Sequence, residues 1–133
     1  MSRITTDTCI LCPNGCELEI HWVKGETGVR VMEVIGHRCP RGVEYGTEEV
    51  VAPKRTVTTT LRVIGGIRPL VSVRTASPIP KKKIADCLAE LRQTTVQAPV
   101  CRGDKILENT ARSGVAVVAT RSVACRSEVR CNR

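Results

Sequence analysis

Aromatic residues are almost absent from this sequence, whose 133 residues include one Trp, one Tyr and no Phe. The interior must therefore be built from Val, Ile and Leu, and a chain of this length buries only a modest core. Long apolar runs are absent too, the longest lying near Val115–Ala119. A membrane-spanning helix needs roughly 20 such residues. Because the N-terminus shows neither an apolar signal region nor a transit peptide, we expect a soluble, cytoplasmic protein.

Catalytic signatures are also missing. The sequence contains no Ser/His/Asp arrangement, no phosphate-binding glycine loop and no nucleotide-binding fingerprint. His21 and His37 are its only histidines, which leaves few candidates for a general base. Because a Rossmann-type glycine turn is lacking, we do not expect the chain to bind a flavin by itself. We therefore predict a protein without a catalytic site of its own.

Cysteine, in contrast, is abundant, with eight residues in all. Cytosolic thiols stay reduced, so this number indicates metal or redox chemistry rather than disulfides. Three cysteines form the pattern Cys9-x₂-Cys12-x₃-Cys16, and Cys39 follows after twenty-two further residues. This three-plus-one layout is typical of a [4Fe–4S] cluster, because one loop reaches about three of its iron corners, whereas structural zinc sites more often pair two knuckles. We predict that these four cysteines hold a [4Fe–4S] cluster, with zinc as the alternative.

The residues between Cys16 and Cys39 predict an antiparallel hairpin. The stretch 18–22 alternates apolar and polar side chains, as a half-buried strand does. Glycine-rich turn residues at 24–28 and a returning strand at 29–34 follow. Since a hairpin brings its two ends together, we expect Cys39 to lie beside Cys16.

The second half predicts a larger α+β domain. Its expected elements are strands at 57–64, 67–73, 96–101, 105–109 and 115–120, with one main helix at 81–92. Pro69 favours an edge position for the strand at 67–73, and the apolar run at 115–120 suits a central strand. A short helix near 41–49 and a linker near 52–55 precede this domain.

The fold class that we predict is therefore α+β. A small N-terminal metal-binding β-hairpin module occupies residues 1–52. It is followed at 53–121 by an antiparallel sheet with one main helix. Residues 122–133 are polar and basic, and we expect them to form a flexible tail.

Charge divides the chain along the same line. Residues 1–50 hold five Lys or Arg against eight Asp or Glu, a net charge of −3, whereas residues 51–133 hold sixteen against five, a net charge of +11. The positive half is expected to face an acidic partner or an anion. Cations in the first turn of a helix oppose its dipole, so three lysines kept there indicate another role, such as binding an anion or an acidic partner. The alternative is that the lysines are a solvated charge run and the helix begins after them. The candidate docking residues are Lys54, Arg55, Lys81, Lys82 and Lys83.

The remaining cysteines and the histidines carry other predictions. Cys87 falls on the apolar stripe of the predicted helix, so we expect it to pack in the core. Cys101 is interpreted as structural, His21 as a solvated strand residue, and His37 as a neighbour of the metal ligands. A second cluster is disfavoured, because four scattered thiols would have to converge to form it. Those four are Cys87, Cys101, Cys125 and Cys131.

The cysteine segment resembles the N-terminal cluster-binding segment of molybdopterin oxidoreductases such as formate dehydrogenases and nitrate reductases. The likeness consists of the Cys-x₂-Cys-x₃-Cys opening, the remote Cys39, and the basic residue and glycine at Arg41 and Gly42. It implies that Arg41 and Gly42 lie beside the cluster and that Arg41 eases electron passage towards a partner. The resemblance covers about residues 7–55, and because the molybdopterin-binding domains have no counterpart, it does not imply molybdenum.

Over nearly its whole length the chain also resembles a small bacterial and archaeal family known only as a domain of unknown function. The matching stretches are the four cysteines, Pro53-Lys54-Arg55 with Thr58-Thr59-Thr60, Pro78-Ile79-Pro80-Lys81, Ala98-Pro99-Val100 with Gly103-Asp104, and Val118-Ala119-Thr120-Arg121. Family members look like companions of flavin-dependent dehydrogenases, including relatives of glycerol-3-phosphate dehydrogenase and NADH-linked oxidoreductases, which implies a redox complex. The tail departs from the family, because Cys125 and Cys131 lie beyond the shared ending.

Two functions follow from these observations. The first is an electron-transfer subunit that relays electrons through a [4Fe–4S] cluster for a flavoprotein dehydrogenase. The second is a zinc-stabilised binding module for a partner protein or nucleic acid. Nucleic acid is disfavoured, because single-strand binders stack bases on aromatic rings and the only rings, Trp22 and Tyr45, lie in the acidic half. A weaker third reading is a structural subunit whose metal only holds the hairpin together.

Overall fold

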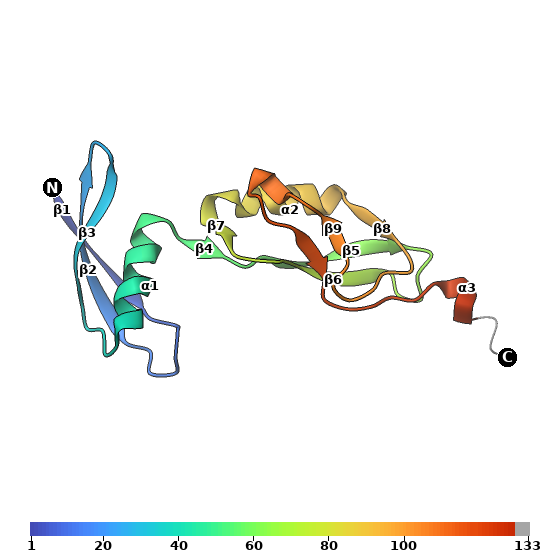
Figure 1. The fold of residues 1–133 in the computed structure, drawn as a ribbon, viewed down its shortest axis with the longest axis horizontal. Coiled ribbons are helices and arrows are strands. Elements are labelled where there is room, and N and C mark those ends of the chain that lie inside the picture. The colour runs from blue at the N-terminus through green and yellow to red at the C-terminus, as the bar shows by residue number, and fades with distance from the viewer. Residues whose placement is uncertain (130–133) are drawn as a thin grey trace. The chain divides into compact units, whose positions relative to one another are not determined.

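The chain divides into two compact units, Met1–Lys54 and Arg55–Arg133. The computed structural model describes residues 1–129 (Figure 1). The predicted α+β class is confirmed, because each unit combines a mainly antiparallel sheet with a helix packed against it. No helix of the described residues is long and apolar enough to cross a membrane.

The first unit is a three-stranded sheet with one helix rather than a bare hairpin. Its strands lie in the order β1-β2-β3, and the helix α1 follows them. The elements are β1 (Ser2–Thr8), β2 (Glu17–Gly25), β3 (Gly28–Ile35) and α1 (Pro40–Val51). The predicted hairpin is β2–β3. β1 was not predicted, because almost every side chain of that strand is exposed and it carries a single apolar residue, Ile4.

Helix α1 covers one face of this sheet. Leu18, Ile20 and Val34 point to that face and are buried, so the alternation seen in the sequence has its physical origin here. Gly46 lets the helix approach closely, since an added Cβ would lie 3.2 Å from the Ile20 side chain. The helix begins at Pro40, whose fixed φ suits the first helical position.

The second unit is a five-stranded sheet in the order β8-β5-β6-β10-β9. Every pairing is antiparallel except β5–β8, which is parallel. The strands are β5 (Thr58–Ile64), β6 (Leu70–Thr75), β8 (Thr95–Gln97), β9 (Lys105–Leu107) and β10 (Val117–Ala119). The smaller elements are β4 (Lys54–Arg55), which pairs with β7 (Ile79–Pro80), the 3₁₀ turns η1 (Lys81–Lys83) and η2 (Thr110–Arg112), and α3 (Arg126–Val129).

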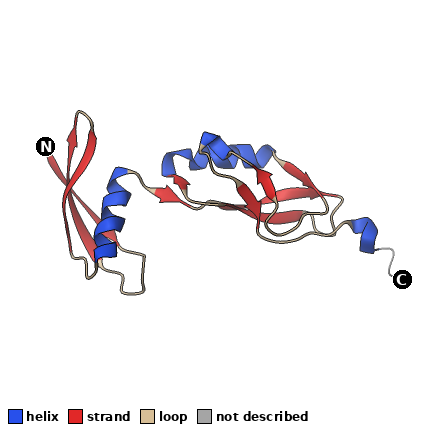
Figure 2. Cartoon of the chain, viewed as in Figure 1, coloured by secondary structure: helices blue, strands red, loops and turns tan. Residues whose placement is uncertain are grey.

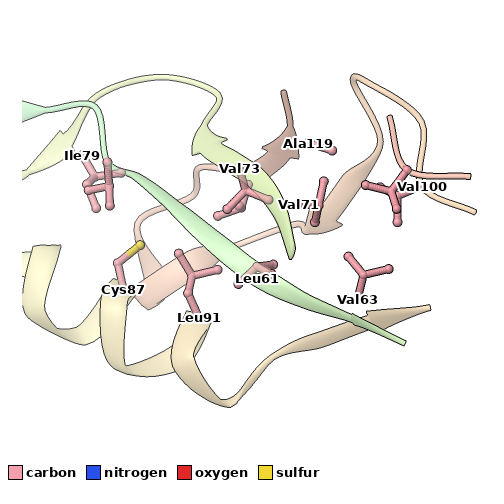
Figure 3. Close-up of a cluster of buried hydrophobic side chains, with 12 residues drawn as sticks. Leu61, Val63, Val71, Val73, Ile79, Cys87, Leu91, Val100 and Ala119 are labelled. Atoms are coloured by element: carbon pink, nitrogen blue, oxygen red, sulfur yellow. The ribbon is translucent and has the colours of Figure 1, made fainter. Parts of the chain in front are cut away.

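The main helix, α2 (Ile84–Gln93), covers one face of this sheet (Figure 2). Cys87 and Leu91 lie on its inner side and are buried, as the predicted apolar stripe requires. They pack with the inward-facing strand residues in a core built from small aliphatic side chains (Figure 3). That core includes Leu61, Val63, Val71, Val73, Ile79, Val117 and Ala119.

One expectation for the second unit was wrong. β6 is not an edge strand, because it pairs with β5 on one side and β10 on the other. Pro69 does not prevent this, since it lies just before the strand begins at Leu70, where its missing N–H removes no hydrogen bond between strands. At one position the predicted tail is also packed against the sheet. Val123 is fully buried and exchanges two backbone hydrogen bonds with Val100, while residues 130–133 lie outside the described part of the chain.

Candidate metal centre

The sheet of the first unit brings the four leading cysteines to one end. The loop 9–16, which carries three of them, joins β1 to β2, and Thr8 pairs with Glu17 across its base. β3 ends at Ile35, which pairs with Glu19 at the same end of β2. Cys39 follows β3 and immediately precedes α1. The strand order agrees with the predicted hairpin: β3 runs antiparallel to β2 and brings the chain, and Cys39 after it, back to the end of β2 that carries the cysteine loop.

Gly36 allows the chain to pass from β3 towards Cys39. Its φ is +87°, and an added Cβ would lie 2.1 Å from the Glu17 carbonyl oxygen. No side chain fits in that space, so the position requires glycine. The role of Gly36 was not predicted, although an isolated glycine in a strand pattern is a known signal of close backbone approach.

Cys9 is the one buried thiol of the four. Its backbone N–H donates to the Cys16 carbonyl at 2.9 Å, which closes the cysteine loop on itself, and its side chain packs in the cluster around Leu18, Ile20 and Val34. The other three cysteines are half-buried, and none of the four forms a disulfide. Three thiols at this end of the sheet are thus accessible to a metal or to solvent.

Cys39 lies where the backbone N–H groups of α1 begin. The Gly42 backbone N–H, which donates to the Cys39 carbonyl oxygen at 3.0 Å, is the main cause of a lowered pKa of the Cys39 thiol; partial burial of the thiol opposes this effect. Arg41 lowers the pKa further through its side chain, its backbone N–H and its charge. Hydrogen bonds to the charged form of a group favour that form. Arg41 and Gly42, predicted to lie near a cluster, therefore both contact Cys39 and stabilise its thiolate, which is the form that binds metals.

The four thiols are not gathered into a closed metal site. Within residues 1–129, no group of three or more His, Cys, Asp or Glu side chains is placed so as to hold a metal ion. Metal binding would require the loop 9–16 or the turn before α1 to close further. The donor set itself suits a thiolate-bound metal, with reduced cysteines and N–H donors on one sulfur. The metal site therefore stays a prediction.

Both histidines have other partners. His37 Nδ1 is 2.9 Å from the Val34 carbonyl oxygen, and an added Cβ at Gly42 would lie 2.9 Å from the His37 Cβ. His37 thus fixes the turn that leads to Cys39. His21 Nε2 is 2.6 Å from Glu19 Oε1. Both side chains lie on the face of the sheet away from α1, so His21 does not pack against that helix.

The run of three lysines precedes the main helix instead of forming its first turn. Lys81–Lys83 make a 3₁₀ turn, and α2 begins at Ile84 with Asp86 in its first turn, as the dipole favours. Lys81 and Lys82 are exposed. Lys83 Nζ donates to the Arg112 carbonyl at 2.6 Å, which gives it a structural role.

The two cations near the linker are placed differently. Lys54 Nζ lies 3.6 Å from Glu48 Oε1, and an exposed pair of this kind is weak. Lys54 and Arg55 form β4, which pairs with β7, the strand that leads directly into the three lysines. Strand pairing thus connects all five predicted docking residues.

Sequence reasoning also missed a polar clamp on α2. Thr110 is fully buried, and its Oγ1 lies 2.8 Å from Glu90 Oε2 and 3.2 Å from Cys87 Sγ. The Ala111 N–H donates to the same carboxylate oxygen at 2.9 Å. Ala111 and Arg112 both have positive φ, at 49° and 52°, a conformation that needs support from its surroundings. The clamp supplies that support, and Cys87 is a core residue as expected.

The remaining cysteines do not form a second group in the described residues. Cys101 is exposed, and its backbone N–H donates to the Asp104 carboxylate at 2.8 Å, which fits a structural turn. Cys125 is half-buried and makes a long contact of 3.9 Å to the Ala98 carbonyl oxygen. The position of Cys131 lies outside the described residues.

The fold and its cysteine-bearing end thus define an α+β protein with a candidate thiolate metal centre in its first unit. A family model described as "Protein of unknown function (DUF1667)" matches residues 40–121. This match covers more than half of the chain, which therefore belongs to that family. The matched region begins at Pro40, so it includes α1 and most of the second unit but none of the four leading cysteines. No curated protein and no solved structure matches the chain.

Proposed function

We propose that this protein is a small cytoplasmic iron–sulfur subunit that relays electrons for a flavin-dependent dehydrogenase. Cys9, Cys12, Cys16 and Cys39 would hold the [4Fe–4S] cluster. The observation that carries the proposal is that the sheet brings Cys39 to the same end as the loop with the other three cysteines, where the neighbouring Gly42 and Arg41 lower the pKa of its thiol. When bound, the cluster would supply reversible one-electron storage.

The rest of the first unit would position and tune these ligands. The N–H groups of Arg41 and Gly42 and the Arg41 guanidinium act on the sulfur of Cys39, and hydrogen bonds to cluster sulfurs are one of the means by which a protein sets the reduction potential. The burial of Cys9 limits access of water to one side of the ligand loop. The chain needs no further catalytic group, because the substrate chemistry would belong to the flavoprotein.

The second unit would provide the contact with that flavoprotein. Lys81 and Lys82 are exposed cations without a role in the packing of α2, and strand pairing links them to Lys54 and Arg55. Rim charges of this kind mainly accelerate association with an acidic surface and make it dependent on salt. Lys83, held by the Arg112 carbonyl, is expected to contribute less.

Anaerobic purification of the full chain tests the metal. We expect a brown protein with broad absorption at roughly 400 nm and about four irons and four sulfides per chain. Each of the four Cys→Ser variants should lose most of that iron. The matched control is Cys101→Ser, which removes an exposed thiol of the second unit. A colourless protein that holds one zinc per chain would refute the iron–sulfur function and support the zinc-stabilised module.

A further inference from the structure

The two sheets each leave one face uncovered, and the two faces have opposite charge. In the second unit, the side away from α2 carries the outward-facing residues of the strands, hereafter the basic face. It consists of Thr58, Thr60, Arg62 and Ile64 of β5, Leu70, Ser72 and Arg74 of β6, Thr95 and Gln97 of β8, Lys105 of β9 and Val118 of β10. None of them is buried.

The basic face has three cations and no carboxylate. The five strands of this sheet contain no Asp or Glu at any position. Arg74 Nη1 donates to the carbonyls of Thr75 and Ala76, which holds its guanidinium in place. The Arg62 side chain makes no hydrogen bond or ion pair with any residue in the described part of the chain, although its backbone belongs to the sheet. It lies between two exposed apolar side chains, Ile64 on its own strand and Leu70 directly opposite, at 52% and 51% exposure.

The uncovered side of the first unit has the complementary chemistry. Cross-strand partners share a face of the sheet, so the pairings Thr6–Glu19, Ile4–His21, Ile35–Glu19 and Glu33–His21 place these residues on the side away from α1. This acidic face consists of Ile4, Thr6, Thr8, Glu17, Glu19, His21, Glu33 and Ile35, with the cation Arg30 at the far end.

The acidic face is also hollowed. A pocket opens on it between the ends of the strands, lined by Thr6, Thr8, Glu17, Glu19, Ile35 and Gly36 among others. Glu17 and Glu19 supply two carboxylates there, of which Glu19 also contacts His21 Nε2 through Oε1 at 2.6 Å, and Ile35, which is 45% exposed, supplies an apolar wall. An arginine side chain matches such a hollow, because its stem packs on apolar surface while its guanidinium binds carboxylates.

We propose that the acidic face of one copy of this chain binds the basic face of a second copy, with Arg62 entering the hollow between Glu17 and Glu19. Charge and apolar content match on both sides, since Ile4 and Ile35 oppose Ile64 and Leu70. A polynucleotide fits the basic face less well, because its strands offer no aromatic ring for a base to stack on. The interface is heterologous, because it joins two different surfaces. Each copy therefore offers one acidic face and one basic face to its neighbours.

Sedimentation equilibrium of the full chain under reducing conditions tests this proposal. Wild type should self-associate at about 20 mM salt and dissociate at about 500 mM salt, since exposed ion pairs are screened at high ionic strength. The double variants Glu17→Lys/Glu19→Lys and Arg62→Glu/Arg74→Glu should each be monomeric at low salt. The control is Glu26→Lys/Arg92→Glu, which reverses exposed charges outside both faces and should associate as wild type does.

Mixing the two monomeric variants gives the sharpest result. Each retains the face that the other has lost, and the two reversed faces again carry opposite charges, so an equimolar mixture should associate at low salt although neither variant does so alone. A chain that carries all four reversals should self-associate again. Trp22 fluorescence and circular dichroism show whether each variant is folded.

Three results would overturn the proposal. Wild type could remain monomeric at every concentration and salt, or the two variants could fail to pair on mixing although both are folded. The third is binding of a nucleic acid oligonucleotide that is lost in Arg62→Glu/Arg74→Glu while wild type stays monomeric, which would make nucleic acid the ligand of the basic face.

Discussion

Replacement of Gly36 by Ala tests whether close backbone packing holds the cysteine-bearing end together. The added Cβ would lie 2.1 Å from the Glu17 carbonyl oxygen and 3.3 Å from the carbonyl carbon. Both atoms belong to the backbone of β2, so no side-chain rotation relieves the clash. The residue would also keep a φ of +87°, which an L side chain rarely adopts.

The expected cost has two parts. A positive φ costs a non-glycine residue about 1–2 kcal/mol, and forcing atoms into a packed space costs about 1–3 kcal/mol. The free energy of unfolding of a unit of this size is roughly 3–8 kcal/mol at the usual 0.05–0.15 kcal/mol per residue. Gly36→Ala should therefore remove about 2–5 kcal/mol and leave the first unit partly or wholly unfolded.

Urea denaturation followed by tryptophan fluorescence measures this effect. Trp22 is the only Trp in the chain and lies in the first unit, so its signal reports on that unit. Gly28→Ala is the control within the same unit, with φ of +131° and no atom within 4 Å. If Gly36→Ala costs no more than Gly28→Ala, the close-packing argument is wrong.

Three further predictions concern other parts of the chain. In the metal-free protein, iodoacetamide should alkylate Cys39 at lower pH than in the Arg41→Gln variant, because Arg41 lowers the pKa of this thiol; peptide mass spectrometry measures the alkylated fraction. Since the pKa of Cys39 is lowered in the folded state, the stability that its thiolate contributes is present above the unfolded-state pKa. This stability is lost as the pH falls through the folded-state pKa. Thr110→Val should destabilise the second unit by about 1–3 kcal/mol in chemical denaturation followed by circular dichroism, since it removes the hydrogen bond from the buried Thr110 hydroxyl to the charged Glu90 carboxylate, while Thr110→Ser should retain most of the stability. Val123→Ala should cost about 1–3 kcal/mol by the same measurement, and no loss would mean that residue 123 does not belong to the core.

Periodicity predicted the elements whose two faces differ in environment. β2 and β5 alternate buried and exposed residues along their length, and the inner side of α2 carries Cys87 and Leu91 at helical spacing. Such patterns are visible in a single sequence because each side chain responds to its own side of the element. The route of Cys39 was predictable for a related reason: turn residues between two strands fix where the second strand ends.

Contacts between distant segments were beyond prediction. β1 has no apolar face, so only its pairing with β2 defines it. Val123 is buried because Val100 and Gly66 lie next to it in the fold, and nothing within its polar sequence neighbourhood indicates this. The clamp of Glu90 and Thr110 joins residues twenty positions apart through a turn whose backbone conformation the residue types do not suggest. The charge asymmetry was readable from the sequence, but which charged residues share a face of each sheet became clear only from the strand register.

The burial of Val123 has a consequence for the order of events during synthesis. The first unit is complete at residue 54, and its strands and helix contact their neighbours in sequence. It can therefore fold, and present its cysteines, while the ribosome still makes the second unit. The second unit has to wait, because its core closes only when residue 123 pairs with residue 100 and because β10 and β9 complete the sheet late in the chain. If the cysteine loop holds a metal as proposed, the metal could be delivered in a period when the first unit is folded and the second is still being made.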